Sequence, residues 1–341
     1  MTRAGQPLRA LAALFQGELP EEAEWSRIID LANRAWLTPA VHVALEKHGR
    51  LAEIPDAVRD YIAVLHERNV ERNGRLRSQL IEALGALNRA SIEPILLKGA
   101  VSLFVGDEAK VGSRMISDLD ISIEPYQAAA AAAALRNIGY GATDNPREFA
   151  RTIDVGVVEF HDRPNFRSER YLSGDLRQSA PLIEREGVSA HVPTATARAL
   201  HLIVHDMIKE GDYWRFRINL RHLRDLVDLS ASSEGIDWDA VSGALPDRVG
   251  RGALAMQLNA LQNLFSVETP ANLRRGAGAR LRHSARIAAT DEGLASAPIR
   301  LAGRILWGAR RFRDSYSRRG AKDFAGRVRR NLVEPTKGST V

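Results

Sequence analysis

The 341-residue chain contains no cysteine. It therefore cannot form disulfides, bind zinc or iron–sulfur clusters through thiolates, or use a cysteine nucleophile. Long hydrophobic runs are also missing, because the longest is the alanine-rich stretch Ala128–Leu135, well short of the roughly 18 residues that a membrane-spanning helix needs. The first 20 residues have a leucine and alanine patch broken by Arg9 and Gln16 without a convincing cleavage site. We expect a helix there and a cytoplasmic protein.

Acidic residues are scarce at the C-terminal end. Residues 300–341 contain 12 Lys/Arg and 3 Asp/Glu, a local net charge of 12 − 3 = +9, whereas the whole chain carries +6. This arm is also amphipathic, because apolar side chains recur at helical spacing: Leu301, Ile305, Ala309, Phe312 and Tyr316. The pattern predicts either a terminal helix docked on the protein or a surface for an anionic partner, such as a membrane surface or nucleic acid.

Hydrophobic periodicity divides the chain into four regions. We predict an N-terminal helical region over 1–90, a core containing strands over 91–190, a C-terminal helical region over 191–298 and the basic amphipathic arm over 299–341. The fold class that this order predicts is α+β, with a small mixed sheet flanked by N-terminal and C-terminal helical regions.

The residue pattern also predicts individual elements. Leucines and isoleucines on one face predict a long helix over 56–90, and alternation predicts half-buried strands over 115–123 and 152–161. The remaining expectations are a strand start at 92–97, a brief helix at 100–105, a polar loop at 106–113, an alanine-rich helix at 126–137 and less regular chain at 269–298.

Asp118 and Asp120 are the most informative pair. They lie two residues apart on an expected strand, so both side chains leave the same face. Two adjacent carboxylates repel each other and stay ionised most readily with a cation between them. Mg²⁺, with Mn²⁺ as a possible substitute, suits such oxygen ligands. We choose Glu159, which shares a strand face with His161, as the third metal ligand. The alternatives are Asp154, near the start of the strand, and Asp162, on its other face.

Two neighbouring features suit phosphate binding. Lys98 and Gly99 stand where a strand passes into a helix, and the free N–H groups of a helix start bind anions. Arg114, four residues before Asp118, is placed to hold a phosphate oxygen. Read singly, the first feature is also typical of a plain turn, and the second of a surface arginine that neutralises a nearby acid.

A later helix carries His201 and His205 on one face, followed directly by Asp206. One hypothesis is a metal hydrolase of the His-Asp type, but the chain has no HExxH motif. The others are histidines that line a catalytic cleft and ordinary core histidines. Farther along, Arg221 and Asp225 have the i, i+4 spacing of a helical ion pair.

Taken together, these residues resemble a bacterial family of uncharacterised nucleotidyltransferases within the DNA polymerase beta-like superfamily. The resemblance covers roughly residues 60–265. It rests on Leu97-Lys98-Gly99, Arg114, the Asp118/Asp120 pair, the strand Val158–His161, and His201 and His205 with the downstream Arg221 and Asp225.

This resemblance implies a Mg²⁺-dependent enzyme that moves a nucleoside monophosphate from an NTP, with ATP the default donor, to a hydroxyl of an unknown acceptor and releases pyrophosphate. It implies that Asp118, Asp120 and Glu159 form a catalytic two-metal site. We assign nucleotide binding to a further set: Lys98, Gly99, Arg114, His161, His201 and His205.

Two departures from the superfamily pattern keep another function open. Gly99 is followed by alanine and lies 19 residues before Asp118, and glutamate stands at 159 where the family has aspartate. The alternatives are a catalytically weakened nucleotide-binding or scaffold protein of the same fold, and an RNA-directed nucleotidyltransferase that uses the basic arm.

Overall fold

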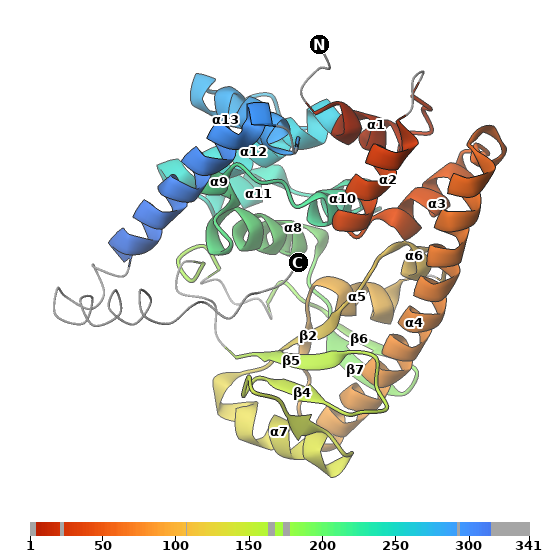
Figure 1. The fold of residues 1–341 in the computed structure, drawn as a ribbon. Coiled ribbons are helices and arrows are strands. Elements are labelled where there is room, and N and C mark those ends of the chain that lie inside the picture. The colour runs from red at the N-terminus through yellow and green to blue at the C-terminus, as the bar shows by residue number, and fades with distance from the viewer. Residues whose placement is uncertain are drawn as a thin grey trace, which may run out of the picture.

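A mixed sheet of seven short strands forms the middle of the chain (Figure 1). The computed structural model describes residues 5–20, 24–106, 108–162, 168–172, 178–291 and 294–314. The strand order is β3-β4-β5-β2-β1-β7-β6, with β2·β5 and β1·β7 parallel and the other pairs antiparallel. The strands are β1 (Ile95–Leu96), β2 (Asp118–Ser122), β3 (Gly141–Ala142), β4 (Glu148–Ala150), β5 (Val157–His161), β6 (Leu182–Arg185) and β7 (Val188–His191).

Helices precede, interrupt and follow this sheet, so the predicted α+β class is confirmed. The α-helices are α1 (Gln6–Leu14), α2 (Trp25–Arg34), α3 (Thr38–Lys47), α4 (Asp56–Arg89), α5 (Lys98–Val105), α6 (Glu108–Ser113), α7 (Ala128–Asn137), α8 (Ala195–Val204), α9 (Asp212–Arg215), α10 (Leu220–Ser230), α11 (Trp238–Gly243), α12 (Arg248–Phe265) and α13 (Ala277–Ala289). Short turns of other helix types are η1 (Leu51–Glu53), η2 (Pro125–Gln127), η3 (His205–Lys209) and η4 (Leu294–Ser296), and a last helix covers 297–314.

The long helix α4 joins the two parts of the molecule. Its 34 residues extend about 51 Å at 1.5 Å per residue. Near its start Ile62 belongs to a core made of helices, and from Leu76 onward its apolar side chains pack against the sheet. In Figure 1 it runs beside the molecule from the helical part to the sheet. The predicted helix over 56–90 is confirmed.

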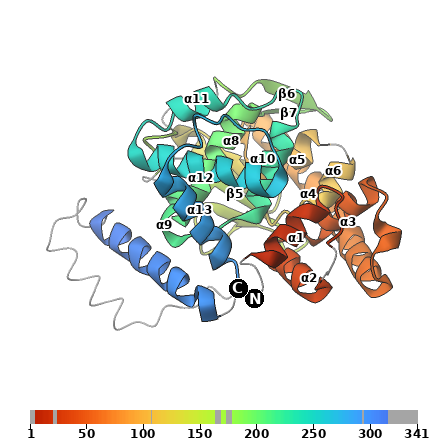
Figure 2. The same cartoon turned by 90° about the horizontal axis from the view of Figure 1, so that it is seen from above.

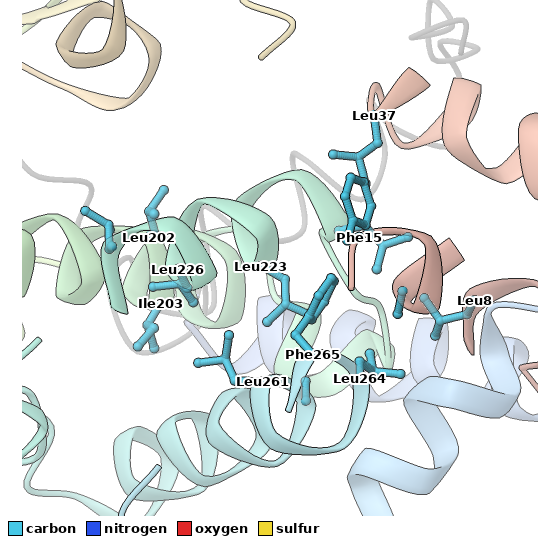
Figure 3. Close-up of a cluster of buried hydrophobic side chains, with 14 of the residues drawn as sticks. Leu8, Phe15, Leu37, Leu202, Ile203, Leu223, Leu226, Leu261, Leu264 and Phe265 are labelled. Carbon is cyan, nitrogen blue, oxygen red and sulfur yellow. The ribbon is translucent and has the colours of Figure 1, made fainter. Parts of the chain in front are cut away.

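The first and last parts of the chain share one hydrophobic core. Figure 3 shows Leu8 of α1 and Phe15 beside Leu264 and Phe265 of α12, and the two phenylalanine ring centroids are 6.2 Å apart. A second core fills the space between the sheet and α4, α5 and α7. In β2 the buried face consists of Leu119 and Ile121, so the polar face of this strand is turned away from that core.

The C-terminal helix over 297–314 stands apart from the rest of the helical bundle in Figure 2. It contacts the α9 region through Trp307, whose ring stacks on Trp214 with centroids 5.5 Å apart. The predicted apolar stripe is turned outward, because Leu301 and Ile305 are 58% and 62% exposed. Residues 315–341 of the predicted arm lie outside the described residues, and the anionic partner stays a prediction. No described helix is both long and apolar enough to cross a membrane.

Two expectations about local structure were wrong. Residues 106–113 are not a polar loop, because they contain α6. Asn73 of α4 donates to the carbonyls of Val111 and Arg114, each at 2.7 Å, and so satisfies groups that the end of such a short helix leaves free.

The irregular chain expected over 269–298 includes the 13-residue helix α13. Here its buried Arg286, bonded to Gln257 of α12 at 2.9 Å, provides a tertiary contact that periodicity does not reveal.

We predict that Asn73→Ala lowers the free energy of unfolding by about 1–3 kcal/mol, because it removes the side-chain donor of the buried Val111 carbonyl and leaves the Arg114 carbonyl with only the longer bond from Asn69, at 3.2 Å. Urea denaturation would measure the change. Asn137→Ala, at an exposed position on α7, is the matched control and should stay within about 0.5 kcal/mol of the unaltered protein. Equal effects of the two substitutions would contradict the role given to Asn73.

Candidate active site

Two parallel strands bring the predicted carboxylates to one face of the sheet. In the β2·β5 register Asp120 lies directly opposite Glu159, and Asp118 lies opposite Val157. Because side chains alternate between the faces of a strand, Asp118, Asp120 and Glu159 all project from the polar face. The antiparallel pairing of β1 with β2 brings the start of α5 next to this face.

Asp120 is the most buried of these acids, with 1% of its surface exposed. Its Oδ1 atom accepts a hydrogen bond from Lys98 Nζ at 2.7 Å and lies 2.7 Å from His161 Nε2. Burial alone would raise the pKa of the Asp120 carboxyl, but the hydrogen bond with His161 and the charge of Lys98 hold it well below its usual range. Asp120 is therefore ionised at neutral pH although it is buried.

The donor atoms at this position fit a divalent cation. Asp120, Glu159 and His161 each offer one ligand atom, and these atoms lie within 4.8 Å of one another. Two carboxylate oxygens suit Mg²⁺ or Mn²⁺, and the imidazole nitrogen is tolerated better by Mn²⁺. Asp118 is not in this group of three, and its Oδ1 accepts a hydrogen bond from Ser117 at 3.0 Å. The Asp118 side chain nevertheless projects from the same face of β2 as Asp120.

Lys98 has a backbone conformation that is unusual for lysine. Its φ angle is +45°, in the left-handed region, at the first residue of α5. Non-glycine residues adopt this region at a cost, and such strain gathers at functional sites. The strained turn brings the ammonium group of Lys98 onto Asp120, so the predicted Lys98-Gly99 feature lies beside the acids as expected.

Arg114 forms an ion pair with Asp225 of α10. Its Nε and Nη2 atoms donate to the two carboxylate oxygens of Asp225 at 2.9 and 2.8 Å. A Cβ atom at position 99 would lie 2.6 Å from Arg114 Nη1, so glycine is needed there to make room for the guanidinium. Burial would raise the pKa of Asp225, but the charge of Arg114 lowers it below the usual value. The phosphate contact of Arg114 stays a prediction.

The expectation that Arg221 and Asp225 form a helical ion pair was wrong. Asp225 pairs with Arg114, which reaches it from another part of the chain. Arg221 instead donates to the carbonyl of Met115 at 3.3 Å and lies over the ring of Trp36, 5.0 Å from its centroid. Asp225 pairs with Arg114 in preference to Arg221 because two parallel charge-assisted hydrogen bonds are stronger than one i, i+4 contact.

The rings of His201 and His205 are stacked, with centroids 6.4 Å apart. His201 lines a small cavity together with Lys98 and Arg114. Burial, together with the charges of His205 and Lys98, lowers the pKa of His201 to about 3. His205 Nδ1 lies 3.0 Å from Asp206 Oδ1. Nucleotide binding by either histidine stays a prediction.

A cleft of about 1000 Å³ opens next to these helices. It is lined by residues from the N-terminal helices, from the segment around α9 and from the C-terminal helix, among them Trp36, Asp206, Arg217, Arg221 and Arg304. Local sequence pattern does not mark Trp36 as a lining residue, because the helices that meet here are far apart in the chain. His222, which lies 2.8 Å from Asp206, was also missed.

We predict that Arg114→Met lowers the free energy of unfolding by about 3–5 kcal/mol, because it leaves the Asp225 carboxylate buried without a partner. The double variant Arg114→Met/Asp225→Leu should recover much of that loss. Since the pKa of Asp225 is lowered in the folded state, the contribution of the pair is full above about pH 4 and is lost as the pH falls through the folded pKa. Chemical denaturation of the single and double variants would measure both effects. Additive losses would contradict a buried pair.

A second prediction concerns His201. A histidine whose folded pKa is about 3 binds a proton near pH 5 only in the unfolded state, so it favours unfolding as the pH falls below about 6.5. We expect about 1–2 kcal/mol of stability to be lost between pH 8 and pH 5 on this account, and His201→Asn should remove that part of the slope. The surface variant His48→Asn is the control. An unchanged slope in His201→Asn would contradict the buried neutral imidazole.

A comparison with protein families agrees with this geometry. Residues 21–247 match the model of a family described as uncharacterised nucleotidyltransferase. No curated protein and no solved structure is significantly similar to the chain. The match covers α2 to α11 and includes the three carboxylates of the acidic face and the predicted nucleotide-binding residues. The chain therefore belongs to the uncharacterised nucleotidyltransferase family.

Proposed function

We propose that the protein is a Mg²⁺-dependent nucleotidyltransferase that uses an NTP, with ATP as the default donor. The acceptor hydroxyl attacks the α-phosphorus, the bond from that phosphorus to the bridging oxygen breaks, and pyrophosphate leaves. The observation that carries the proposal is the register of β2 and β5, in which Asp120 lies opposite Glu159 with Asp118 on the same face.

Asp118, Asp120 and Glu159 are the residues that would hold the metal. When bound, Mg²⁺ supplies charge for the triphosphate oxygens and favours deprotonation of the acceptor hydroxyl. Asp120 is held ionised by its neighbours, so it needs no proton loss before it binds a cation. Glu159 is half-buried, 3.8 Å from His161 Nε2. The side chain of glutamate is one methylene longer than that of aspartate, so the Glu159 carboxylate lies farther from the backbone of β5.

Lys98 would neutralise phosphate charge. Its ammonium is bonded to Asp120 at 2.7 Å, and an anionic nucleotide beside the carboxylates would share this lysine. Gly99 lets Arg114 pack against the turn, and the Arg114–Asp225 pair joins the sheet to α10. We propose that this pair fixes the position of the turn, in addition to any direct phosphate contact.

The cleft of about 1000 Å³ is the proposed place for the acceptor or for the base and sugar of the nucleotide. Its volume lies at the upper end of the range of small-molecule sites. Arg221 lines this cleft and also contacts the backbone of Met115, three residues before Asp118. Arg221 therefore connects the cleft to the segment that leads into β2, while the small cavity lined by Lys98, Arg114 and His201 lies beside the acidic face.

We expect Asp120→Asn and Glu159→Gln each to lower the rate of pyrophosphate release by about 100- to 1000-fold, the usual loss when one electrostatic contact to the reacting group is removed. The assay would use each labelled NTP with Mg²⁺ or Mn²⁺ and would record both pyrophosphate release and self-labelling. Glu184→Gln is the matched control, because Glu184 is an exposed carboxylate on the edge strand β6 of the same sheet. Wild-type turnover in Asp120→Asn would refute the proposed site.

One observation favours a second function, that of a nucleotide-binding or scaffold protein with little catalysis. Asp120 already has two basic partners, Lys98 and His161, so the fold itself balances its charge. Saturable NTP binding without pyrophosphate release or self-labelling, with every NTP and with both metals, would support this function over the transferase.

A further inference from the structure

A second group of metal-ligand side chains lies on helices and is separate from the acidic strands. His205 Nδ1 and His222 Nδ1 approach the same atom, Asp206 Oδ1, at 3.0 and 2.8 Å. The three ligand atoms lie within 4.8 Å of one another. Asp206 is 1% exposed and His222 2% exposed, so this is a buried cluster and not a chance meeting of surface groups.

The hydrogen bonds of this cluster are unevenly distributed. Three nitrogen atoms, from His205, His222 and Asn219, surround Asp206 Oδ1, whereas within the described residues Asp206 Oδ2 and His222 Nε2 are buried without a hydrogen-bond partner. Each buried polar atom without a partner calls for an explanation, and Asp206 Oδ2 is an unused ligand atom of the carboxylate at the centre of the cluster.

Asn219 also approaches the ring nitrogen of His222 that faces Asp206. Its Oδ1 accepts the backbone N–H of His222 as the cap of α10, and this fixes the direction of its amide. Asn219 Nδ2 then lies 3.0 Å from His222 Nδ1. A ring nitrogen that accepts from Asn219 has its lone pair in use and cannot also donate to Asp206 Oδ1. If His222 Nδ1 carries no proton, its lone pair faces Asp206 Oδ1. A cation bound by both atoms would replace that repulsion, while Asn219 Nδ2 donates to Asp206 Oδ1.

The backbone also favours a site here. α8 ends at Val204 and the chain continues as the π-helical turn η3, which contains His205 and Asp206. Single π turns inside helices occur frequently at functional sites. The other nitrogen of His205, Nε2, lies 4.0 Å from Glu210 Oε1. At this distance Glu210 places negative charge near the ring without a hydrogen bond to it.

We propose that His205, Asp206 and His222 form a binding site for a transition-metal cation of the Zn²⁺ type. Two imidazole nitrogens and one carboxylate oxygen suit Zn²⁺, Co²⁺ or Mn²⁺ better than Mg²⁺. Three protein ligands leave a coordination position open for water or a ligand, and Asp206 lines the cleft of about 1000 Å³. The site joins η3 to α10, and it does not depend on the proposed transferase activity.

Metal binding by the full chain tests this site. After removal of metals with a chelator, the protein would be titrated with Zn²⁺, Co²⁺ and Mg²⁺ by calorimetry, and the visible spectrum of Co²⁺ would report nitrogen ligation. We expect one equivalent of Zn²⁺ or Co²⁺ to bind far more tightly than Mg²⁺. His222→Ala should weaken this binding at least 100-fold, and Asn219→Ala by about 10- to 100-fold.

The double variant Asp120→Asn/Glu159→Gln is the matched control, because it alters the acidic face of the strands and leaves the helical cluster intact. It should bind the same equivalent with unchanged affinity. If circular dichroism shows that His222→Ala is unfolded, His205→Ala serves as the second ligand variant, because His205 is only half-buried. Absence of stoichiometric binding by the unaltered protein, or binding that is lost only in the Asp120/Glu159 variant, would overturn the proposal.

Discussion

Buried carboxylates that must remain ionised govern the architecture of this protein. Asp120 and Asp206 are each 1% exposed and Asp225 is half-buried, and each has a lowered pKa. A buried charge is tolerated only when it is paired and hydrogen-bonded. Each carboxylate therefore requires its own basic or polar partners, and the elements that carry these partners are drawn together at the site.

The partner of each acid comes from a different element. Asp120 of β2 is held by Lys98 at the start of α5 and by His161 at the end of β5. Asp225 of α10 is held by Arg114, which precedes β2. These contacts connect the strands to the helices by charge, whereas hydrophobic packing within each part is provided by two separate cores. The geometry of the acidic face thus depends on both parts of the molecule.

The larger of the two cores explains how the helices are arranged around the site. It includes residues of α1–α3 and of α8–α12, which are distant in sequence, and α4 passes from this core to the sheet. Because α1–α3 and α8–α12 pack in the same core, the cleft beside Asp206 has walls from the N-terminal helices as well as from the C-terminal ones. Trp36 and Arg221, which contact each other across it, are an example.

Local pattern alone was enough for several features of this protein. The period of two in β2 and β5 predicted which face carries Asp118, Asp120 and Glu159, since side chains alternate along any strand. The long apolar face of α4 and the α+β order of elements were predicted for the same reason, that periodicity follows from local backbone geometry.

The tertiary structure decided the partners. The sequence did not indicate that Arg114 would reach Asp225, that α4 would satisfy the carbonyls of α6 through Asn73, or that His222 would approach Asp206. Such pairings join residues from 16 to 111 positions apart, and the spacing of residues in the chain does not indicate which distant groups meet. They are selected by burial, because every polar group that the packing removes from water must find a partner among the groups that the same packing brings near.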